Sequence, residues 1–167
     1  MNLIIRAIKE SEYPLLEDFL YHALYLPPGA EPVPREIIFI PDIYIYVDGF
    51  GGADDLGLVA EQDGKIIGAA WTRIIKGYGY LDEHTPELAI SILPGFQGCG
   101  VGTQLLTRLL EQLRDRGYER TSLSVQKDNP AARLYERLGY RITGERTDGA
   151  GNEDYLMIKE LDPPGKP

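Results

Sequence analysis

Residues 94–102 read Pro94-Gly95-Phe96-Gln97-Gly98-Cys99-Gly100-Val101-Gly102. The apolar run at 88–93 before them predicts a buried strand, and leucines at helical spacing after them predict a helix over 103–116. Glycines let a backbone approach a ligand closely, and a helix start offers unpaired N–H groups and the positive end of its dipole. This turn from strand to helix is therefore predicted to bind phosphate groups.

Two common phosphate-binding loops do not fit this stretch. A Walker A loop needs a lysine where Val101 stands, although Gly95 and Gly100 have the right spacing. A Rossmann loop begins correctly at Gly98 and Gly100, but Thr103 stands in place of its last glycine and the segment follows a hairpin in mid-chain. A plain structural turn is the simpler alternative, but it does not explain the alternating glycines.

A third pattern, Q/R-x-x-G-x-G/A, is matched in full by Gln97, Gly100 and Gly102. Here the sequence resembles the GNAT acetyltransferase superfamily. Residues 129–140 are similar to that superfamily's second signature, an Asn-led helix that carries a tyrosine and closes on glycine and an aromatic residue. The resemblance covers residues 87–140. Cys99 and Gln97 depart from it, because relatives often carry basic residues there.

The remaining elements extend this pattern to an α/β fold. Strands are predicted over residues 3–8, 56–61, 66–75, 88–93, 121–125, 140–145 and 155–160, and helices over 15–24, 103–116 and 130–138. Ser11 is the predicted cap of the first helix, and 43–47 alternates like a short extra strand. These elements predict a mixed sheet flanked by helices, and the resemblance implies that this sheet is mostly antiparallel. We expect one domain over 1–161 and a disordered tail at 162–167.

Bulk composition narrows the function. The chain has 167 residues, a net charge of −9 and one cysteine, so it has no internal disulfide. The negative charge disfavours nucleic acid as a partner, and no apolar run suggests a signal peptide or a membrane span. We therefore expect a cytoplasmic protein, monomeric or homodimeric, whose acidity serves solubility or attracts a cationic substrate.

The resemblance implies an acetyl-CoA site. The two central strands would diverge near Ile92 and Val125, and the backbone N–H of Ile92 would face the thioester carbonyl. Asn129 would cap its helix, bind the pantetheine arm, or do both. Tyr135 is the matching general acid, since a phenol with a pKa of about 10 is protonated at neutral pH; its alternative is a core aromatic. The implied cofactor-binding residues are Ile92, Leu93, Gln97, Gly98, Cys99, Gly100, Val101, Gly102, Thr103, Asn129, Ala132 and Tyr135.

The general base is less defined by the sequence. Glu87 begins the strand that carries Ile92, close to a glutamate that relatives often keep; the alternative is an exposed strand-end carboxylate. Weaker candidates are Asp42, Asp82, Glu83 and His84. With two histidines and no ligand spacing, a metal site is not expected. Tyr44, Tyr46, Tyr78 and Tyr80 line an acceptor pocket or simply alternate on strands. Carboxylates at Glu31, Asp42, Asp48, Asp54 and Asp55 would favour a cationic acceptor if they border it.

These features predict transfer of an acetyl group from acetyl-CoA to a primary amine, on a small molecule or a peptide, by direct attack in a ternary complex. A non-catalytic acyl-CoA-binding sensor or partner module is the alternative, and a dinucleotide- or ATP-binding enzyme is the third reading. The sequence leaves open the acceptor, the acyl chain length, the base and the oligomeric state.

Overall fold

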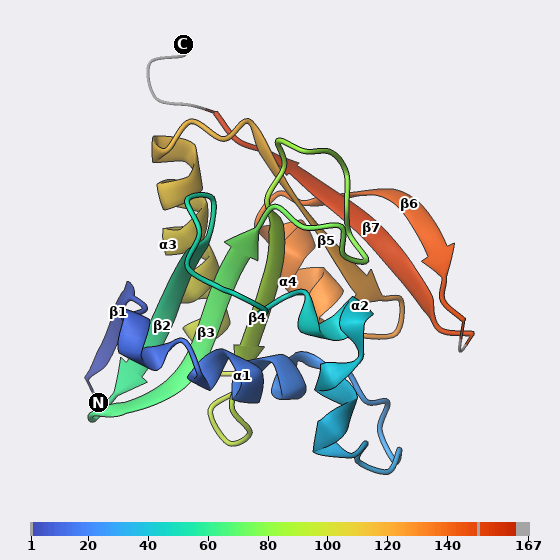
Figure 1. The fold of residues 1–167 in the computed structure, drawn as a ribbon, viewed down its shortest axis with the longest axis horizontal. Helices are drawn as coiled ribbons and strands as arrows, with labels where there is room; N and C mark the ends of the chain where they lie inside the picture. The colour runs from blue at the N-terminus through green and yellow to red at the C-terminus, as the bar shows by residue number, and fades with distance from the viewer. Residues whose placement is uncertain (1, 150, 163–167) are drawn as a thin grey trace.

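A seven-stranded sheet in the order β1-β2-β3-β4-β5-β7-β6 forms the centre of the protein (Figure 1). The computed structural model describes residues 2–149 and 151–162, so most of the predicted disordered tail lies outside the described residues. All neighbouring strands are antiparallel except β4 and β5. The predicted mixed sheet is therefore confirmed. The strands are β1 Leu3–Ala7, β2 Leu56–Gln62, β3 Lys65–Arg73, β4 Glu87–Ile92, β5 Arg120–Gln126, β6 Arg141–Thr147 and β7 Glu153–Glu160.

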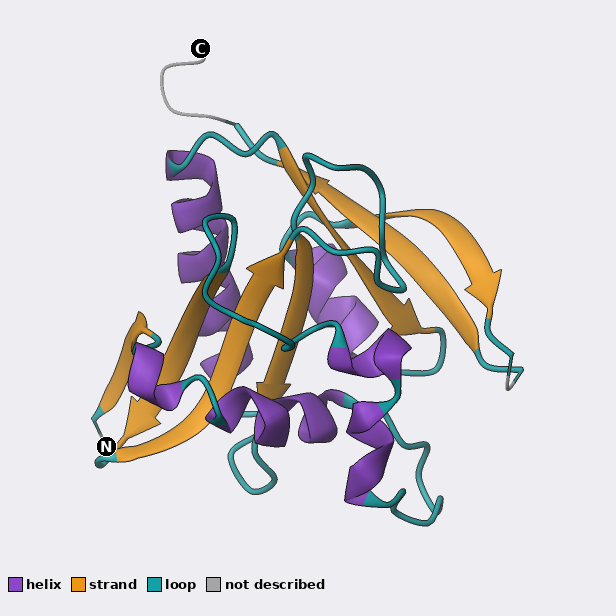
Figure 2. Ribbon diagram, viewed as in Figure 1, coloured by secondary structure: helices purple, strands orange, loops and turns teal. Residues whose placement is uncertain are grey.

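Helices cover both faces of this sheet (Figure 2). One face packs against α3 and α4, and the other against α1, η2 and α2. β3 shows why: Ala69 and Trp71 enter the core on the α1 side, whereas Ala70 enters the core on the α3 side. The helices are η1 Glu10–Glu12, α1 Leu15–Ala23, η2 Arg35–Phe39, α2 Pro41–Tyr44, α3 Val101–Asp115 and α4 Ala131–Arg137.

Local sequence patterns predicted most of these helices and strands correctly. The hairpin between β2 and β3 turns at Asp63 and Gly64, whose φ angles of 50° and 82° are the positive values that a tight hairpin turn needs. The predicted leucine stripe of α3 is buried, with Leu105, Leu109 and Leu113 at 0% exposure. Each such side chain contributes about 1.5–3 kcal/mol when it leaves water.

Two local predictions are wrong. Residues 43–47 do not form a strand: they belong to α2 and the helical turn after it, because Pro41 starts a helix well and Ile43, Tyr46 and Val47 share one helical face. Ser11 does not cap α1 either. It lies inside η1, where the Glu12 carboxylate accepts the backbone N–H of Lys9 at 2.8 Å.

Candidate active site

The strands β4 and β5 separate almost at once. They pair in register only at Glu87 opposite Ser122, so the predicted divergence begins earlier than expected. Beyond that point, the N–H of Leu93 donates to the carbonyl of Ile67 on β3 at 2.8 Å. Because bonding directions alternate along an antiparallel strand, the N–H of Ile92 points the other way, into the opening toward β5.

A cavity of about 490 Å³ lies between residues 88–90 of β4 and 124–126 of β5, and neither Ile92 nor the glycine loop lines it. Its walls include Tyr135 and Asn129 near α4, Ile90, Ser124 and Val125 on the strands, and Leu20, Leu24, Ile37, Ile43, Tyr46 and Tyr78 on the α1 side. Because residues from both faces of the sheet line it, the cavity passes between the two strands. A molecule on the α4 side can therefore meet a second molecule on the α1 side.

The glycine loop leads from β4 into α3. Gly100 caps α3 with a φ of 83°, a left-handed conformation that glycine adopts without strain. The first turn of α3 contains no acidic residue, so its free N–H groups and dipole favour an anion. The Gln97 side chain donates to the carbonyl of Ile92 at 3.0 Å and so ties the loop to the end of β4. Cys99 is exposed, and its thiol lies 3.6 Å from the carbonyl oxygen of Gln97.

Three other predicted cofactor residues differ in their setting. The Asn129 side chain caps α4, because its oxygen accepts the N–H of Ala131 at 2.9 Å. Asn129 also lines the cavity, whereas Ala132 is buried in the core on the α3 side. Leu93 packs against the core on the α1 side.

Tyr135 lines the cavity from α4. The residue is 8% exposed, and its ring meets that of Tyr140 edge to face at a centroid distance of 5.9 Å. Burial raises the pKa of Tyr135 to about 12. Its hydroxyl therefore carries a proton throughout the neutral range. Tyr135 is therefore both an aromatic residue of the core and a part of the cavity wall.

Glu87 is buried on the opposite face of the sheet. It is 2% exposed, so the alternative of an exposed strand-end carboxylate is wrong. Its Oε2 atom accepts hydrogen bonds from the Tyr46 hydroxyl and, at 3.0 Å, from the N–H of Gly79. Burial raises the pKa of Glu87 to about 7, against the opposing effect of these hydrogen bonds. Such a carboxylate changes charge near neutral pH, as a general base must.

Tyr46 connects Glu87 to the cavity. Tyr46 lines the cavity wall, and its hydroxyl accepts the N–H of Tyr78 at 2.9 Å while donating to Glu87. Gly79 makes this arrangement possible, because a Cβ atom there would lie 2.6 Å from the backbone carbon of Leu123. The sequence offered one signal for this role, the Gly77-Tyr78-Gly79 stretch, whose glycines permit close approach.

Comparison with known proteins fits this geometry. A model described as the Acetyltransferase (GNAT) family matches residues 18–140. The chain belongs to this family. An uncharacterised N-acetyltransferase of Mycobacterium tuberculosis is 38% identical over 109 residues, which span 62% of this chain and 66% of that protein. The ribosomal protein bS18-alanine N-acetyltransferase of Haemophilus influenzae is 39% identical over 85 residues, 51% of this chain and 54% of that protein.

Solved structures share the GNAT fold along the whole chain. The ribosomal-protein-S18-alanine N-acetyltransferase of Escherichia coli has a TM-score of 0.70 at 23% identity, covering 99% of this chain and 97% of that chain. The structure of yncA from Salmonella typhimurium with its cofactor acetyl-CoA has a TM-score of 0.72 at 21% identity, covering 100% of this chain and 98% of that chain. At these identities the likeness establishes the fold.

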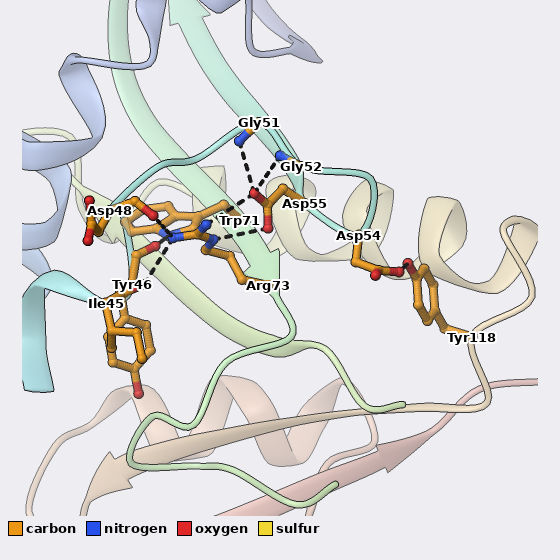
Figure 3. A network of polar contacts seen from close by, with 10 residues as sticks. All are labelled: Ile45, Tyr46, Asp48, Gly51, Gly52, Asp54, Asp55, Trp71, Arg73 and Tyr118. Carbon is orange, nitrogen blue, oxygen red and sulfur yellow. Dashed lines mark hydrogen bonds and ion pairs between the residues drawn. The ribbon is translucent and has the colours of Figure 1, made fainter. Parts of the chain in front are cut away.

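Figure 3 shows how this GNAT chain holds the turn that carries Tyr46. Arg73 pairs with Asp55 at 3.0 Å and donates to the carbonyls of Ile45 and Asp48 at 2.9 and 2.8 Å. The indole N–H of Trp71 donates to the carbonyl of Tyr46 at 2.9 Å. The turn is therefore bonded to β3 on both sides of Tyr46, which fixes where its hydroxyl lies.

Breaking this ion pair is expected to destabilise the protein strongly. The side chains of Arg73 and Asp55 are 12% and 8% exposed, so Asp55→Asn leaves a buried guanidinium without its counter-ion. Loss of one partner of a buried pair typically costs about 3–5 kcal/mol. The measurement is the urea midpoint at unchanged slope. Asp54→Asn is the control: the adjacent carboxylate is exposed and bonds the Tyr118 hydroxyl, so a change under about 1 kcal/mol is expected. Equal losses in the two variants would contradict this role of Arg73.

The predicted acidic border of the acceptor pocket is wrong. Asp54 and Asp55 lie in the network of Figure 3, and none of the five carboxylates predicted between 31 and 55 lines the cavity. Asp42 belongs to α2, and the other four lie in turns and loops. The carboxylates in the cavity wall are Asp148 and Asp154. Asp148 directly follows the end of β6, and Asp154 is the second residue of β7.

Some of the other predicted site residues line the cavity and some do not. Of the four tyrosines, Tyr46 and Tyr78 line the cavity, whereas Tyr44 and Tyr80 do not. The weaker base candidates Asp42, Asp82, Glu83 and His84 lie outside its wall. Across residues 2–149 and 151–162, no cluster of His, Cys, Asp and Glu could hold a metal ion. No helix in the same ranges is long and apolar enough to cross a membrane.

Proposed function

We propose that this chain transfers an acetyl group from acetyl-CoA to a primary amine by direct attack in a ternary complex. The observation that carries the proposal is the cavity between β4 and β5. It has Tyr135 in its wall on one face of the sheet and Tyr46, bonded to Glu87, on the other. An acid and a base on opposite faces suit a reaction in which the amine enters from one side and the thiol leaves on the other.

The acetyl donor would lie along the opening from the glycine loop. The N–H groups at the start of α3 hold its pyrophosphate. Lys65 supplies a cation beside the loop, since its ammonium lies 5.5 Å from the ring centre of Phe96. The amide oxygen of Asn129 is occupied by the helix cap, so its NH₂ group is the part that binds the pantetheine arm. The thioester carbonyl then reaches the N–H of Ile92.

The chemical steps follow from these positions. Tyr46 takes a proton from the ammonium group as it passes its own to Glu87, which frees the nitrogen lone pair. The nitrogen bonds to the carbonyl carbon, and the N–H of Ile92 stabilises the charge that develops on the oxygen. The carbon–sulfur bond breaks, and Tyr135 gives its proton to the sulfur. The amide nitrogen then loses its extra proton, either to solvent or to the phenolate of Tyr135.

Acetyl-CoA is expected to raise the thermal midpoint by about 5–10 °C at a hundred times its Kd, because it binds the folded state alone. Gly102→Glu should abolish the rise, since a carboxylate at the start of α3 repels the pyrophosphate. Gly100→Val should do the same by blocking the approach. The measurement is differential scanning fluorimetry with and without ligand.

The control for Gly100→Val is Gly117→Val at the other end of α3. Gly117 has a φ of 90°, like the 83° of Gly100, and a Cβ there would also meet nothing within 4 Å. Both variants therefore carry the same backbone strain, but Gly117→Val should keep the ligand-induced rise. A rise that survives in Gly100→Val and Gly102→Glu would place the donor elsewhere.

Release of free CoA over a panel of amines tests the activity itself. Thiol release that depends on an amine would support transfer. Binding of acetyl-CoA with no release for any amine would make the chain a non-catalytic acyl-CoA-binding module.

A further inference from the structure

The cavity wall contains a buried acid that none of the proposed steps uses. Asp154, near the start of β7, lines the cavity and is 8% exposed. Its Oδ1 atom is buried and has no hydrogen-bond partner among the described residues. Burying a carboxylate oxygen without a partner costs free energy, and a bound donor recovers it if the side chain turns Oδ1 toward the cavity.

Charges of both signs lie near Asp154: besides burial, the charge of Asp148 raises its pKa, and the charge of Arg146 lowers it. Asp148 also lines the cavity, and its two oxygens accept the backbone N–H and side-chain NH₂ of Asn152 at 2.9 and 3.0 Å. Burial and the charge of Asp148 both raise the pKa of Asp154. Arg146 faces Asp154 across the β6–β7 ladder, but it stacks on Tyr78 at 5.0 Å and donates to the Tyr78 carbonyl at 3.1 Å.

The spacing along β5 relates this acid to the reacting end. Ser124 lines the cavity together with Tyr46, whose hydroxyl marks the place of the reacting amine. Gln126, two residues further along β5, pairs in register with Asp154. Two residues of a strand span about 7 Å. The cavity wall also contains apolar side chains, among them Leu24, Ile37 and Ile43.

We propose that the acceptor carries a second positive charge, about 7 Å from its reacting amine across an apolar spacer, and that Asp154 binds this charge with Asp148 beside it. The inference rests on the proposed acetyl transfer, whose acceptor it specifies. Two kinds of acceptor carry a reacting amine and a second positive charge: an alkyl diamine, and a peptide amine followed by a basic side chain.

The first experiment compares diaminopentane with pentylamine, which presents the same reacting amine without the second charge. In the wild type, kcat/KM for the diamine is expected to exceed that for the monoamine by roughly 10–100-fold, the range of a charge-assisted hydrogen bond. Asp154→Asn should remove this advantage, so that kcat/KM falls roughly 10–100-fold more for the diamine than for pentylamine. Glu153→Gln is the control, since the adjacent exposed carboxylate bonds Lys127 outside the cavity; it should keep the advantage.

Three kinetic outcomes would overturn the proposal while acetyl transfer stands. They are equal rates for the diamine and the monoamine in the wild type, an advantage that survives in Asp154→Asn, and an equal loss in Glu153→Gln. A second pair of substrates, alanyl-lysine amide and alanyl-norleucine amide, identifies the source. A larger charge advantage for the peptide pair would assign the second charge to a peptide, and a larger one for the diamine to a small molecule.

A binding measurement separates this inference from the activity. Calorimetry of diaminopentane added to the CoA-bound protein needs no turnover, because no acetyl group is present. Binding that weakens roughly 10–100-fold in Asp154→Asn and not in Glu153→Gln would support the cation site even if no amine were acetylated. Equal binding to all three proteins would refute the site even if acetylation were found.

Discussion

Tyr135→Phe is expected to lower kcat by roughly 10²–10⁴-fold, the usual contribution of a positioned proton donor. The substitution removes only the hydroxyl and keeps the ring, so the edge-to-face contact with Tyr140 remains. Affinity for acetyl-CoA should stay near that of the wild type, because the proton is transferred in the transition state. The measurement is kcat with one good amine, together with acetyl-CoA affinity by calorimetry.

Tyr140→Phe is a matched control within the same aromatic pair. The Tyr140 hydroxyl is buried and without a partner among the described residues, so its removal should leave kcat unchanged and cost little stability. Turnover of Tyr135→Phe at the wild-type rate, where chemistry limits, would mean that the thiolate leaves unaided or by another donor. A parallel fall in affinity and rate would instead assign Tyr135 to shaping the donor channel.

The raised pKa of Tyr135 suits an acid that must not lose its proton early. At about 12 it exceeds the value of about 8.5 for a thiol in water. The burial that disfavours the phenolate also disfavours a thiolate in the same cavity, so the pKa of the leaving thiol rises too.

Glu87→Gln is expected to lower kcat/KM by roughly 10²–10⁴-fold at neutral pH and by less at high pH. The pKa of Glu87 is raised to about 7, so the wild-type rate should rise with pH through that value as the carboxylate loses its proton. The glutamine variant should lack this limb. It should recover as the pH approaches about 10.4, where an alkyl amine loses its own proton.

Tyr46→Phe tests whether the base acts through the tyrosine. The Tyr46 hydroxyl donates to Glu87 and so lowers the pKa of that carboxyl; its removal should move the acid limb to higher pH while the rate falls. Lys9→Gln, remote from the cavity and exposed, should change neither the limb nor the rate. A pH–rate profile of Glu87→Gln that superimposes on the wild type would remove Glu87 from the mechanism.

Much of the fold was predictable because its signals are local. The hairpin at Asp63-Gly64, the leucine stripe of α3 and the asparagine cap of α4 each depend on backbone preferences or periodicity within a few residues. The glycine loop is equally local, and together with the helix at 129–140 it pointed to the family. The segment at 43–47 misled because alternating Ile and Tyr also places residues on one face of a short helix.

The chemistry of the cavity depended on contacts between distant segments, which no local pattern encodes. Burial raises the pKa of Glu87 against the hydrogen bonds from Tyr46 and Gly79, and the turn that carries Tyr46 is held by Arg73 of β3. The sequence determined that a phosphate-binding loop and a capped tyrosine helix exist. Only the tertiary structure decided which acids line the cavity, Asp154 among them and not those at 31–55. The reason is that burial and charge depend on what packs against a side chain, while a chain's local pattern depends on its neighbours in sequence.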